Sequence, residues 1–347
     1  MSRVVIAGET RAHAAARPVV VWLSLVALLI VVMVVVGGMT RLTDSGLSIT
    51  DWRPVTGAIP PLSESDWLLE FEKYRASPQY EHLNRGMGLE EFKGIYWWEW
   101  GHRQLGRLIG VVFAVPLFFF ILTGRVRGGL AAWLLFLLAM GGLQAFVGWI
   151  MVASGLEGTR TTVSHYKLAA HLGLAILIYG MILWTILRLA RGPRPYARRR
   201  GFPLAVLLAV LVFAQILSGA LVAGLDAGLI YNTWPLIDGA WVPQAVVPGL
   251  AGLDDHLTVQ FYHRMLAYVI VAAGLLVALR LWRTKEPGLA TSGLIVALLV
   301  LGQVALGIVT LVTVAPMQHI WLAVAHQLGA LILFSASVVT LYTTRYL

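Results

Sequence analysis

Eight long apolar runs, separated by polar clusters, set the pattern of this chain. A helix crosses a bilayer with about 20 apolar residues, and each run comes near that length. The runs lie at about 19–38, 103–123, 129–153, 164–189, 203–224, 258–282, 289–313 and 320–342. The first run exceeds the roughly 7–15 residues of a signal-peptide core, and no A-x-A cleavage site follows it. The pattern predicts an all-α polytopic membrane protein with eight transmembrane helices.

The composition agrees with this fold class. The chain is 59% hydrophobic and 12% charged, with a mean hydropathy of +0.79. A soluble domain carries about 25% charged residues, so soluble, disordered and coiled-coil proteins are excluded. The chain has no cysteine, which excludes disulfides, thiolate-bound zinc or haem, and cysteine-bound iron–sulfur clusters.

The formal charge of +9 reports topology, because basic residues gather on one side of the predicted bundle. That side, with both termini, holds 15 of the 26 Lys and Arg residues and only Glu9 and Glu286 as acids. By the positive-inside rule it is cytoplasmic. We therefore expect an inner (cytoplasmic) membrane location, cytoplasmic N- and C-termini, and long periplasmic loops at about 39–102 and 225–257. Nucleic acid is not expected as a partner.

Three pairs of matching segments indicate an internal duplication. At offsets of 161, 159 and 155 residues, the pairs are centred on His102/His263, Gln144/Gln303 and His171/His326. Four helices return the chain to its starting side, so the two halves share one orientation about an axis along the membrane normal. We predict two pseudo-symmetric four-helix bundles. The segments are a cytoplasmic tail 1–18, a first half 19–189, a basic cytoplasmic linker 190–202 and a second half 203–343.

Four histidines occupy corresponding places in the two halves: His102, His171, His263 and His326. All lie near the outer ends of alternate helices, and a histidine inside a bilayer is costly and usually functional. Two histidines per half suit bis-imidazole ligation of a haem iron in each bundle. Zinc or copper would need further ligands at the same point. The alternative for each histidine is a hydrogen-bonded helix-packing residue.

The two halves differ beside these histidines. Glu99 stands three residues before His102, whereas Gln260 stands three residues before His263. Residues i and i+3 share a helix face, so Glu99 would bring a titratable carboxylate to the first site. In that interpretation the first half does chemistry and the second only holds a haem. The alternative is a carboxylate that caps the helix or pairs with Arg103.

Other candidates carry less specific signals. His165 and His319, near the outer ends of their helices, are expected to be interfacial or gate residues. Four cations lie at the depth where haem propionates would sit, although snorkelling explains them equally well; they are Arg41, Arg103, Lys167 and Arg264. The first outer loop mixes Pro, Gly and Trp, which predicts an ordered lid with short helices at 64–76 and 88–98.

Motifs along nearly the whole chain resemble the haem A synthase family of the alphaproteobacterial and mitochondrial type. They are GGMTRLTDSGLSITDWRPVTGAIPPL (37–62), EFKGIYWWEWGHRQLGR (91–107), HYKLAAHLGLA (165–175), YNTWPLIDG (231–239), QFYHR (260–264) and AHQLGA (325–330). The E-x-x-H-R motif and the first-loop segment are specific. Some members of the family carry a cysteine pair in an outer loop; this chain has none, so a redox role for such a pair does not apply.

The resemblance implies an enzyme that oxidises the C8 methyl group of haem O to a formyl group for cytochrome oxidase. The oxidation would take two two-electron steps, through an alcohol and a hydrated aldehyde. By the family's pattern, His102 and His171 would hold the substrate haem, His263 and His326 a resident haem b, and Glu99 would assist the oxidation. Haem O synthase and cytochrome oxidase assembly factors are candidate partners, and the electron acceptor and a homo-oligomeric state stay open.

Two other classes fit less well. A di-haem cytochrome that carries electrons across the membrane needs haems at both faces, whereas all four histidines lie near one face. A transporter with a histidine proton relay is disfavoured because the predicted helix cores hold no Asp or Glu away from their ends.

Overall fold

The fold is helical throughout the part of the chain that the computed structural model describes, residues 2–191, 201–313 and 320–346. The helices are α1 Ser2–Leu42, α2 Glu64–Arg75, α3 Pro78–His82, α4 Leu89–Leu122, α5 Gly128–Ala153, α6 His165–Arg191, α7 Phe202–Gly224, α8 His256–Trp282, α9 Pro287–Val312 and α10 Ile320–Tyr346. Among the described residues, every one of these helices except α2 and α3 is long and apolar enough to cross a membrane. In α1 the membrane-spanning segment is Ala16–Leu42. The predicted eight-span membrane protein is confirmed. Most of the linker, residues 192–200, lies outside the described residues.

Local sequence explains where several helices begin. Ser63 caps α2 by accepting from the backbone N–H of Asp66, whose carboxylate accepts in return from the N–H of Ser63. Asp255 caps α8 by accepting from the N–H of Thr258 at 2.8 Å. Proline occupies the first turn of α3, α7 and α9, where its missing N–H costs no helical hydrogen bond.

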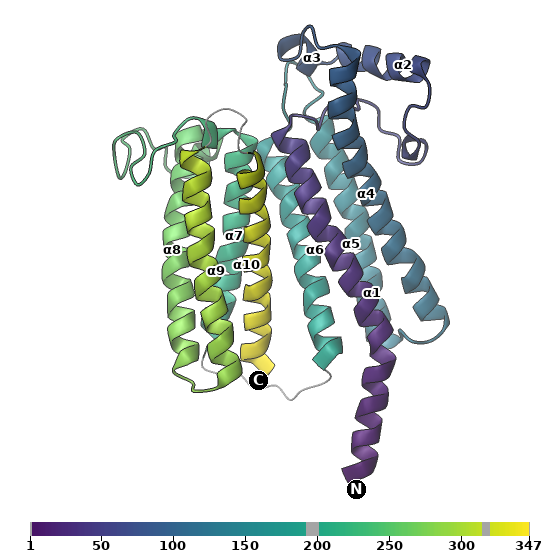
Figure 1. Cartoon of the computed structure of the whole chain (residues 1–347), viewed down its shortest axis with the longest axis vertical. Helices are drawn as coiled ribbons and strands as arrows, with labels where there is room; N and C mark the ends of the chain where they lie inside the picture. Colours follow the sequence, from purple (N-terminus) through teal and green to yellow (C-terminus); the bar gives the residue numbers. More distant parts are fainter. Residues whose placement is uncertain (1, 192–200, 314–319, 347) are drawn as a thin grey trace.

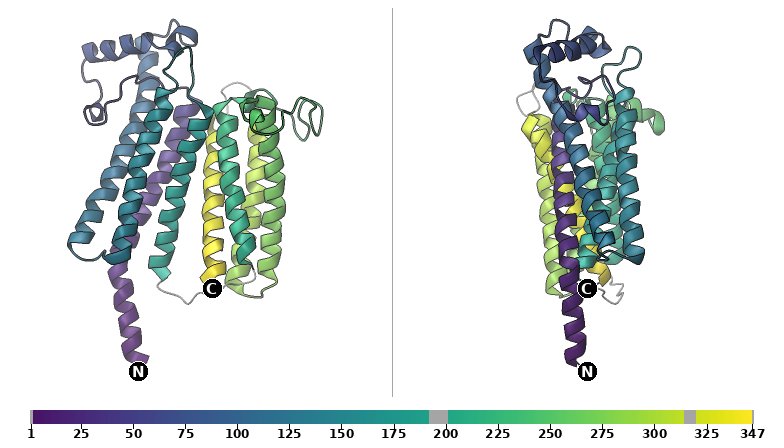
Figure 2. Two further views of the ribbon diagram at one scale, coloured as in Figure 1. Left: turned by 180° about the vertical axis from the view of Figure 1, so that it is seen from behind. Right: turned by 90° about the vertical axis from the view of Figure 1, so that its right-hand side faces the viewer.

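The helices form two rings of four. In the first ring α1 packs against α4, α4 against α5, α5 against α6 and α6 against α1; in the second ring α7, α8, α9 and α10 follow the same cyclic order. The rings meet through α6 with α7, α1 with α10, and α6 with α10, side by side in Figures 1 and 2. These contacts fit a twofold relation between the halves, in which α6 and α10 lie nearest the axis.

Both chain ends lie on one side of the bundle, and the long loops and α2 and α3 lie on the other (Figure 1). The helices α4, α6, α8 and α10 run from the loop side, so each places its histidine toward that side. The orientation of this bundle in a particular membrane stays a prediction from the charge pattern.

The first outer loop folds into a small domain above the first ring. Phe71, Tyr74, Phe92 and Tyr96 form its aromatic core. Helix α2 confirms the short helix expected at 64–76, but the separate helix expected at 88–98 is wrong. Leu89 begins α4, which continues without a break to Leu122, because nothing in the stretch from 89 to 102 stops a helix that starts on Glu90 and Glu91.

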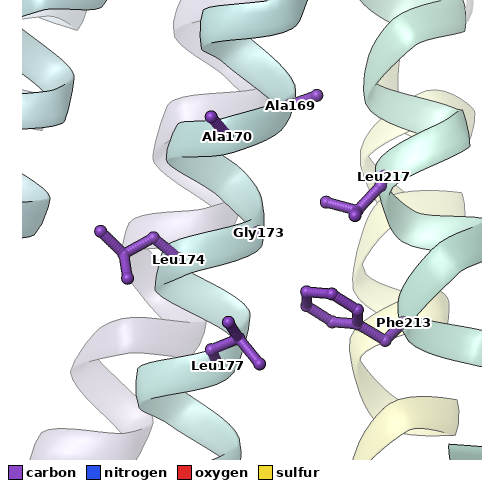
Figure 3. Close-up of a pocket in the computed structure, with 7 residues that line it drawn as sticks. All are labelled: Ala169, Ala170, Gly173, Leu174, Leu177, Phe213 and Leu217. Carbon is purple, nitrogen blue, oxygen red and sulfur yellow. The ribbon is translucent and has the colours of Figure 1, made fainter. Parts of the chain in front are cut away.

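A groove of about 310 Å³ lies between α6 and α7, where the two rings meet. In Figure 3, Phe213 and Leu217 on α7 point toward α6, whereas Leu174 on α6 points away from α7. Leu177 also lines the groove. The remaining lining residues are Ala169, Ala170 and Gly173. The lining is apolar and includes none of the four candidate histidines, so the groove is a feature of the contact between the rings.

Candidate functional site

The four candidate histidines form one pair in each ring. His102 on α4 and His171 on α6 stand on helices that are diagonal in the first ring; His263 on α8 and His326 on α10 do so in the second. The two imidazoles of each pair are near enough to interact electrostatically. All four residues are half-buried. The structure therefore brings together the pairs that the sequence predicts.

Each imidazole lies against a glycine of the neighbouring helix. The glycine–histidine pairs are Gly37 with His102, Gly148 with His171, Gly219 with His263 and Gly307 with His326. A Cβ at these glycines would come within 2.7 to 3.2 Å of the imidazole Cε1. The missing side chain is thus what makes room for the ring, and it fixes the side of the helix on which the ring lies.

A glutamine holds three of the four histidines. The carboxamide nitrogens of Gln144, Gln215 and Gln303 donate to the backbone carbonyls of His171, His263 and His326 at 3.0, 3.0 and 2.7 Å. The same nitrogens lie 3.2, 3.2 and 3.1 Å from Nδ1 of those rings. The nitrogens of Gln144 and Gln215 also lie 3.3 and 3.2 Å from Nε2 of the same rings. Each glutamine therefore binds the backbone of its histidine by a hydrogen bond and lies against the ring, a contact that we call the glutamine clamp.

The donor set fits a haem iron better than a bare metal ion. Among the described residues, no three His, Cys, Asp or Glu side chains gather in a group able to hold a metal ion. A haem supplies four nitrogen ligands itself and needs only two axial ligands, which a histidine pair provides. Buried polar atoms beside the rings also lack a hydrogen-bond partner within the described part of the chain: His102 Nδ1, Gln144 Oε1 and Gln215 Oε1. An iron-bound imidazole carries a proton on its second nitrogen, and the two glutamine oxygens are acceptors of the kind that this proton needs.

Glu99 is buried and is hydrogen-bonded to the first outer loop and to Arg103 of its own helix. The side chain is 3% exposed. Oε1 accepts from Arg103 Nη2 at 2.6 Å, and Oε2 accepts from Ser48 Oγ at 2.8 Å and from the backbone N–H of Ile49 at 2.7 Å. The Arg103 ion pair that one interpretation of the sequence expected is therefore present. A carboxylate has about four acceptor positions, and three of them are used.

Gln260 makes the equivalent contact in the second half. Its Oε1 accepts from Arg264 Nη2 at 2.6 Å, and its Nε2 donates to the carbonyl of Ala227 at 2.9 Å. The Glu-to-Gln difference thus matches a reversal in hydrogen bonding, because the first loop offers donors to this position and the second loop offers an acceptor.

The two arginines bind matching loop carbonyls. Arg103 donates to Ile49 O at 2.8 Å and to Asp51 O at 3.1 Å. Arg264 donates to Tyr231 O at 2.8 Å and to Thr233 O at 2.8 Å. Ile49 and Tyr231 are 182 residues apart, and so are Asp51 and Thr233. The duplication therefore extends into the outer loops. The offset is 161 at the histidines, so the first loop is 21 residues longer, and that insertion contains α2 and α3.

Among the other predicted cations and histidines, Arg41, Lys167 and His165 have structural partners. Arg41 bridges the halves, donating to Asp226 Oδ2 at 2.7 Å and to the carbonyl of Ala223 at 2.9 Å. Lys167 reaches the carbonyl of Ile150 at 3.5 Å. His165 Nε2 lies 3.1 Å from Asp254 Oδ1, which links the start of α6 to the second outer loop. His319 lies outside the described residues.

The sequence interpretation missed the glutamine clamps and the glycine cradles. Gln144 and Gln303 served only to align the repeat, and Gln215 had no part in it. The signal that reveals them is Q-x-x-x-G, which occurs at Gln144–Gly148, Gln215–Gly219 and Gln303–Gly307. The match between α1 and α7 was missed because the loop insertion makes the spacing between these two helices larger than the spacing between the other matching helices.

Comparison with known proteins identifies close relatives over nearly the whole length. The family model described as cytochrome oxidase assembly protein matches residues 20–338. A protein named heme A synthase from Maricaulis maris is 46% identical over 333 residues, which cover 95% of this chain and 96% of the relative. Proteins of the same name from Parvibaculum lavamentivorans and Azorhizobium caulinodans are 49% and 50% identical, over 91% and 96% of both chains.

Proposed function

The chain belongs to the family of cytochrome oxidase assembly proteins, and on that basis we propose that it is a haem A synthase. In this proposal it oxidises the C8 methyl group of haem O to a formyl group. The single observation that carries the proposal is the identity of 46–50% to proteins named heme A synthase over nearly the full chain. The two histidine pairs supply what such an enzyme needs, namely two haem sites in one chain.

The reaction removes four electrons, in two steps of two. The methyl group first becomes an alcohol; the second step gives a hydrated aldehyde, which loses water to leave the formyl group. The two sites then have different tasks, since one holds the molecule that changes and the other holds a cofactor that does not.

We assign the substrate to the first half, between His102 and His171. The asymmetry at Glu99 supports this assignment, because the equivalent Gln260 carries no charge. Glu99 is held rigidly by Arg103, Ser48 and Ile49, and one of its acceptor positions is left. A fixed carboxylate of this kind can accept a proton or stabilise a developing positive charge on the substrate.

We assign haem b to His263 and His326 in the second half. When bound there, it would supply one-electron redox chemistry that passes electrons away from the substrate. The residues of this half orient it: Gln215 and Gln303 clamp the two ligands, and Gly219 and Gly307 admit the rings. Gln260 and Arg264 fasten the second outer loop above the site and so help to exclude water.

The proposed setting is the inner membrane, with the termini in the cytoplasm and both haem sites toward the periplasm. Haem O synthase is a proposed partner because haem O is poorly soluble in water and would pass most easily from one membrane enzyme to another. Cytochrome oxidase assembly factors are proposed partners for the product, and self-association into a homo-oligomer is compatible with the proposal.

A haem extract of the purified protein tests the function. The protein is expressed with and without a haem O synthase, and the extracted haems are separated by chromatography and identified by absorbance. We expect haem A only when haem O is supplied, with haem b in both preparations. Haem b alone in both preparations would contradict the synthase and favour an electron-transfer cytochrome. No haem in either would remove the basis of both sites.

A further inference from the structure

The fourth histidine, His102, lacks the clamp that the other three have. On α5, α7 and α9 a glutamine precedes by four residues the glycine that receives the ring, so both lie on one helix face. Helix α1 has the glycine, Gly37, but Met33 stands four residues before it. Because Gly37 and Gly219 play the same part in the two halves, Met33 occupies the place of Gln215.

The structure confirms that Met33 is next to the same stretch of α4. A Cβ on Gly106, one helical turn beyond His102, would lie 3.4 Å from Met33 Cε. The methionine thus fills the space without offering the donors and the strong acceptor of a carboxamide. His102 Nδ1 is buried and has no hydrogen-bond partner among the residues described here.

A metal-bound histidine is influenced by the group that hydrogen-bonds to its other ring nitrogen. Such a group fixes the ring orientation and raises the basicity of the ligand, and its removal typically weakens binding about 10- to 100-fold. In the second half both ligands have a carboxamide beside Nδ1, whereas in the first half only His171 has one. The amide nitrogen donates to the histidine carbonyl, and the carboxamide oxygen is the atom that can accept from Nδ1–H once iron is bound.

We propose that Met33 makes His102 an exchangeable ligand, so that the first half binds haem reversibly while Gln215 and Gln303 keep the haem of the second half in place. The inference rests on the proposed function, because it takes both halves as haem sites and the first as the substrate site. A substrate has to enter and a product has to leave, whereas a cofactor has to stay. Met33 is therefore a positioning residue, which acts on the haem through His102.

The alternative role for Met33 is simple space-filling between α1 and α4. Leucine fills a similar volume and also lacks a hydrogen-bonding group, so Met33→Leu is the matched control for Met33→Gln. The reverse change, Gln215→Met, removes the clamp from the second half. Gln303→Met provides a second test there if Gln215→Met does not fold.

The experiment measures haem release from the full-length protein, purified in detergent from cells that also express a haem O synthase. Excess apomyoglobin serves as the scavenger, absorbance follows the transfer, and chromatography identifies which haem has left. We expect a fast phase that carries haem O and haem A and a slow phase that carries haem b. Met33→Gln should slow the fast phase about tenfold or more, and Met33→Leu should leave it fast. Gln215→Met or Gln303→Met should accelerate the slow phase by a similar factor.

Equal release rates for Met33→Gln and Met33→Leu would overturn the inference, as would a slow phase that is unchanged in both glutamine variants. The reduction potential and the low-spin absorbance spectrum of haem b provide a further readout. They should shift in Gln215→Met, because the ligand loses its hydrogen-bonding partner, and should stay unchanged in Met33→Leu. Failure of the proposed function is seen separately, as the absence of haem A from the wild-type extract.

Discussion

Glu99 and Gln260 occupy equivalent positions and each accepts a hydrogen bond from an arginine one turn later, at 2.6 Å in both halves. The remaining contacts of these two side chains are opposite in polarity. Glu99 accepts from the first outer loop, and Gln260 donates to the second. One scaffold thus carries a buried negative charge in one half and a neutral amide in the other.

Replacing Glu99 by glutamine should abolish conversion of haem O while haem b remains bound. The substitution removes the charge and turns an amide donor toward Ser48 or Ile49. The measurement is the ratio of haem A to haem O in extracts. Ser48→Ala is the matched control, because it removes one hydrogen bond but keeps the carboxylate, and it should retain most of the conversion. Equal loss in both variants would show that Glu99 only fastens the loop.

Gly307→Ala should lower the haem b content, because its Cβ would lie 2.7 Å from Cε1 of His326 and force the ring to move. Gly302→Ala on the same helix is the control, since no described atom lies within 4 Å of its Cβ position. Alanine favours a helix over glycine by about 1 kcal/mol, so neither substitution harms the helix itself. Haem absorbance per polypeptide measures the effect. Equal haem b content in the two variants would show that Gly307 is not needed to make room for the His326 ring.

The outer-loop domain should loosen in acid. Lys73, helped by Arg53, hydrogen-bonds to Asp51 and holds the pKa of that carboxyl below its ordinary value. A carboxyl whose pKa is lower in the folded state stabilises the fold at pH values above its ordinary pKa. This stabilisation is lost as the pH falls through the pKa of the folded state. Because the group is partly exposed, the ion pairs contribute at most ~1 kcal/mol.

Hydrogen exchange of residues 43–76 as a function of pH checks this expectation. Exchange in the wild type, expressed relative to the intrinsic amide rate at each pH, should rise as the pH falls below about 4. In Asp51→Asn it should already be raised at neutral pH and should lose that part of the pH dependence. An identical pH profile in the two proteins would show that Asp51 does not hold the domain.

Most of the membrane fold could be predicted because it depends on the length of apolar runs and the spacing of repeats. The outer end of α4 could not, because the stretch from Glu90 to Trp100 is polar and aromatic yet continues as one helix with the apolar run. The histidine pairs were predictable from their symmetry. Gln215 and Met33 were not, since a 21-residue loop insertion hides the alignment of α1 with α7, and only the packing shows that they are equivalent.

The division of labour between the halves is tested most directly by the haem content of two variants, His102→Ala and His263→Ala, purified from cells that make haem O. We predict that His102→Ala keeps its haem b but contains no haem A, and that His263→Ala loses haem b. Loss of haem b from a folded His102→Ala protein, with haem b kept by His263→Ala, would contradict this prediction.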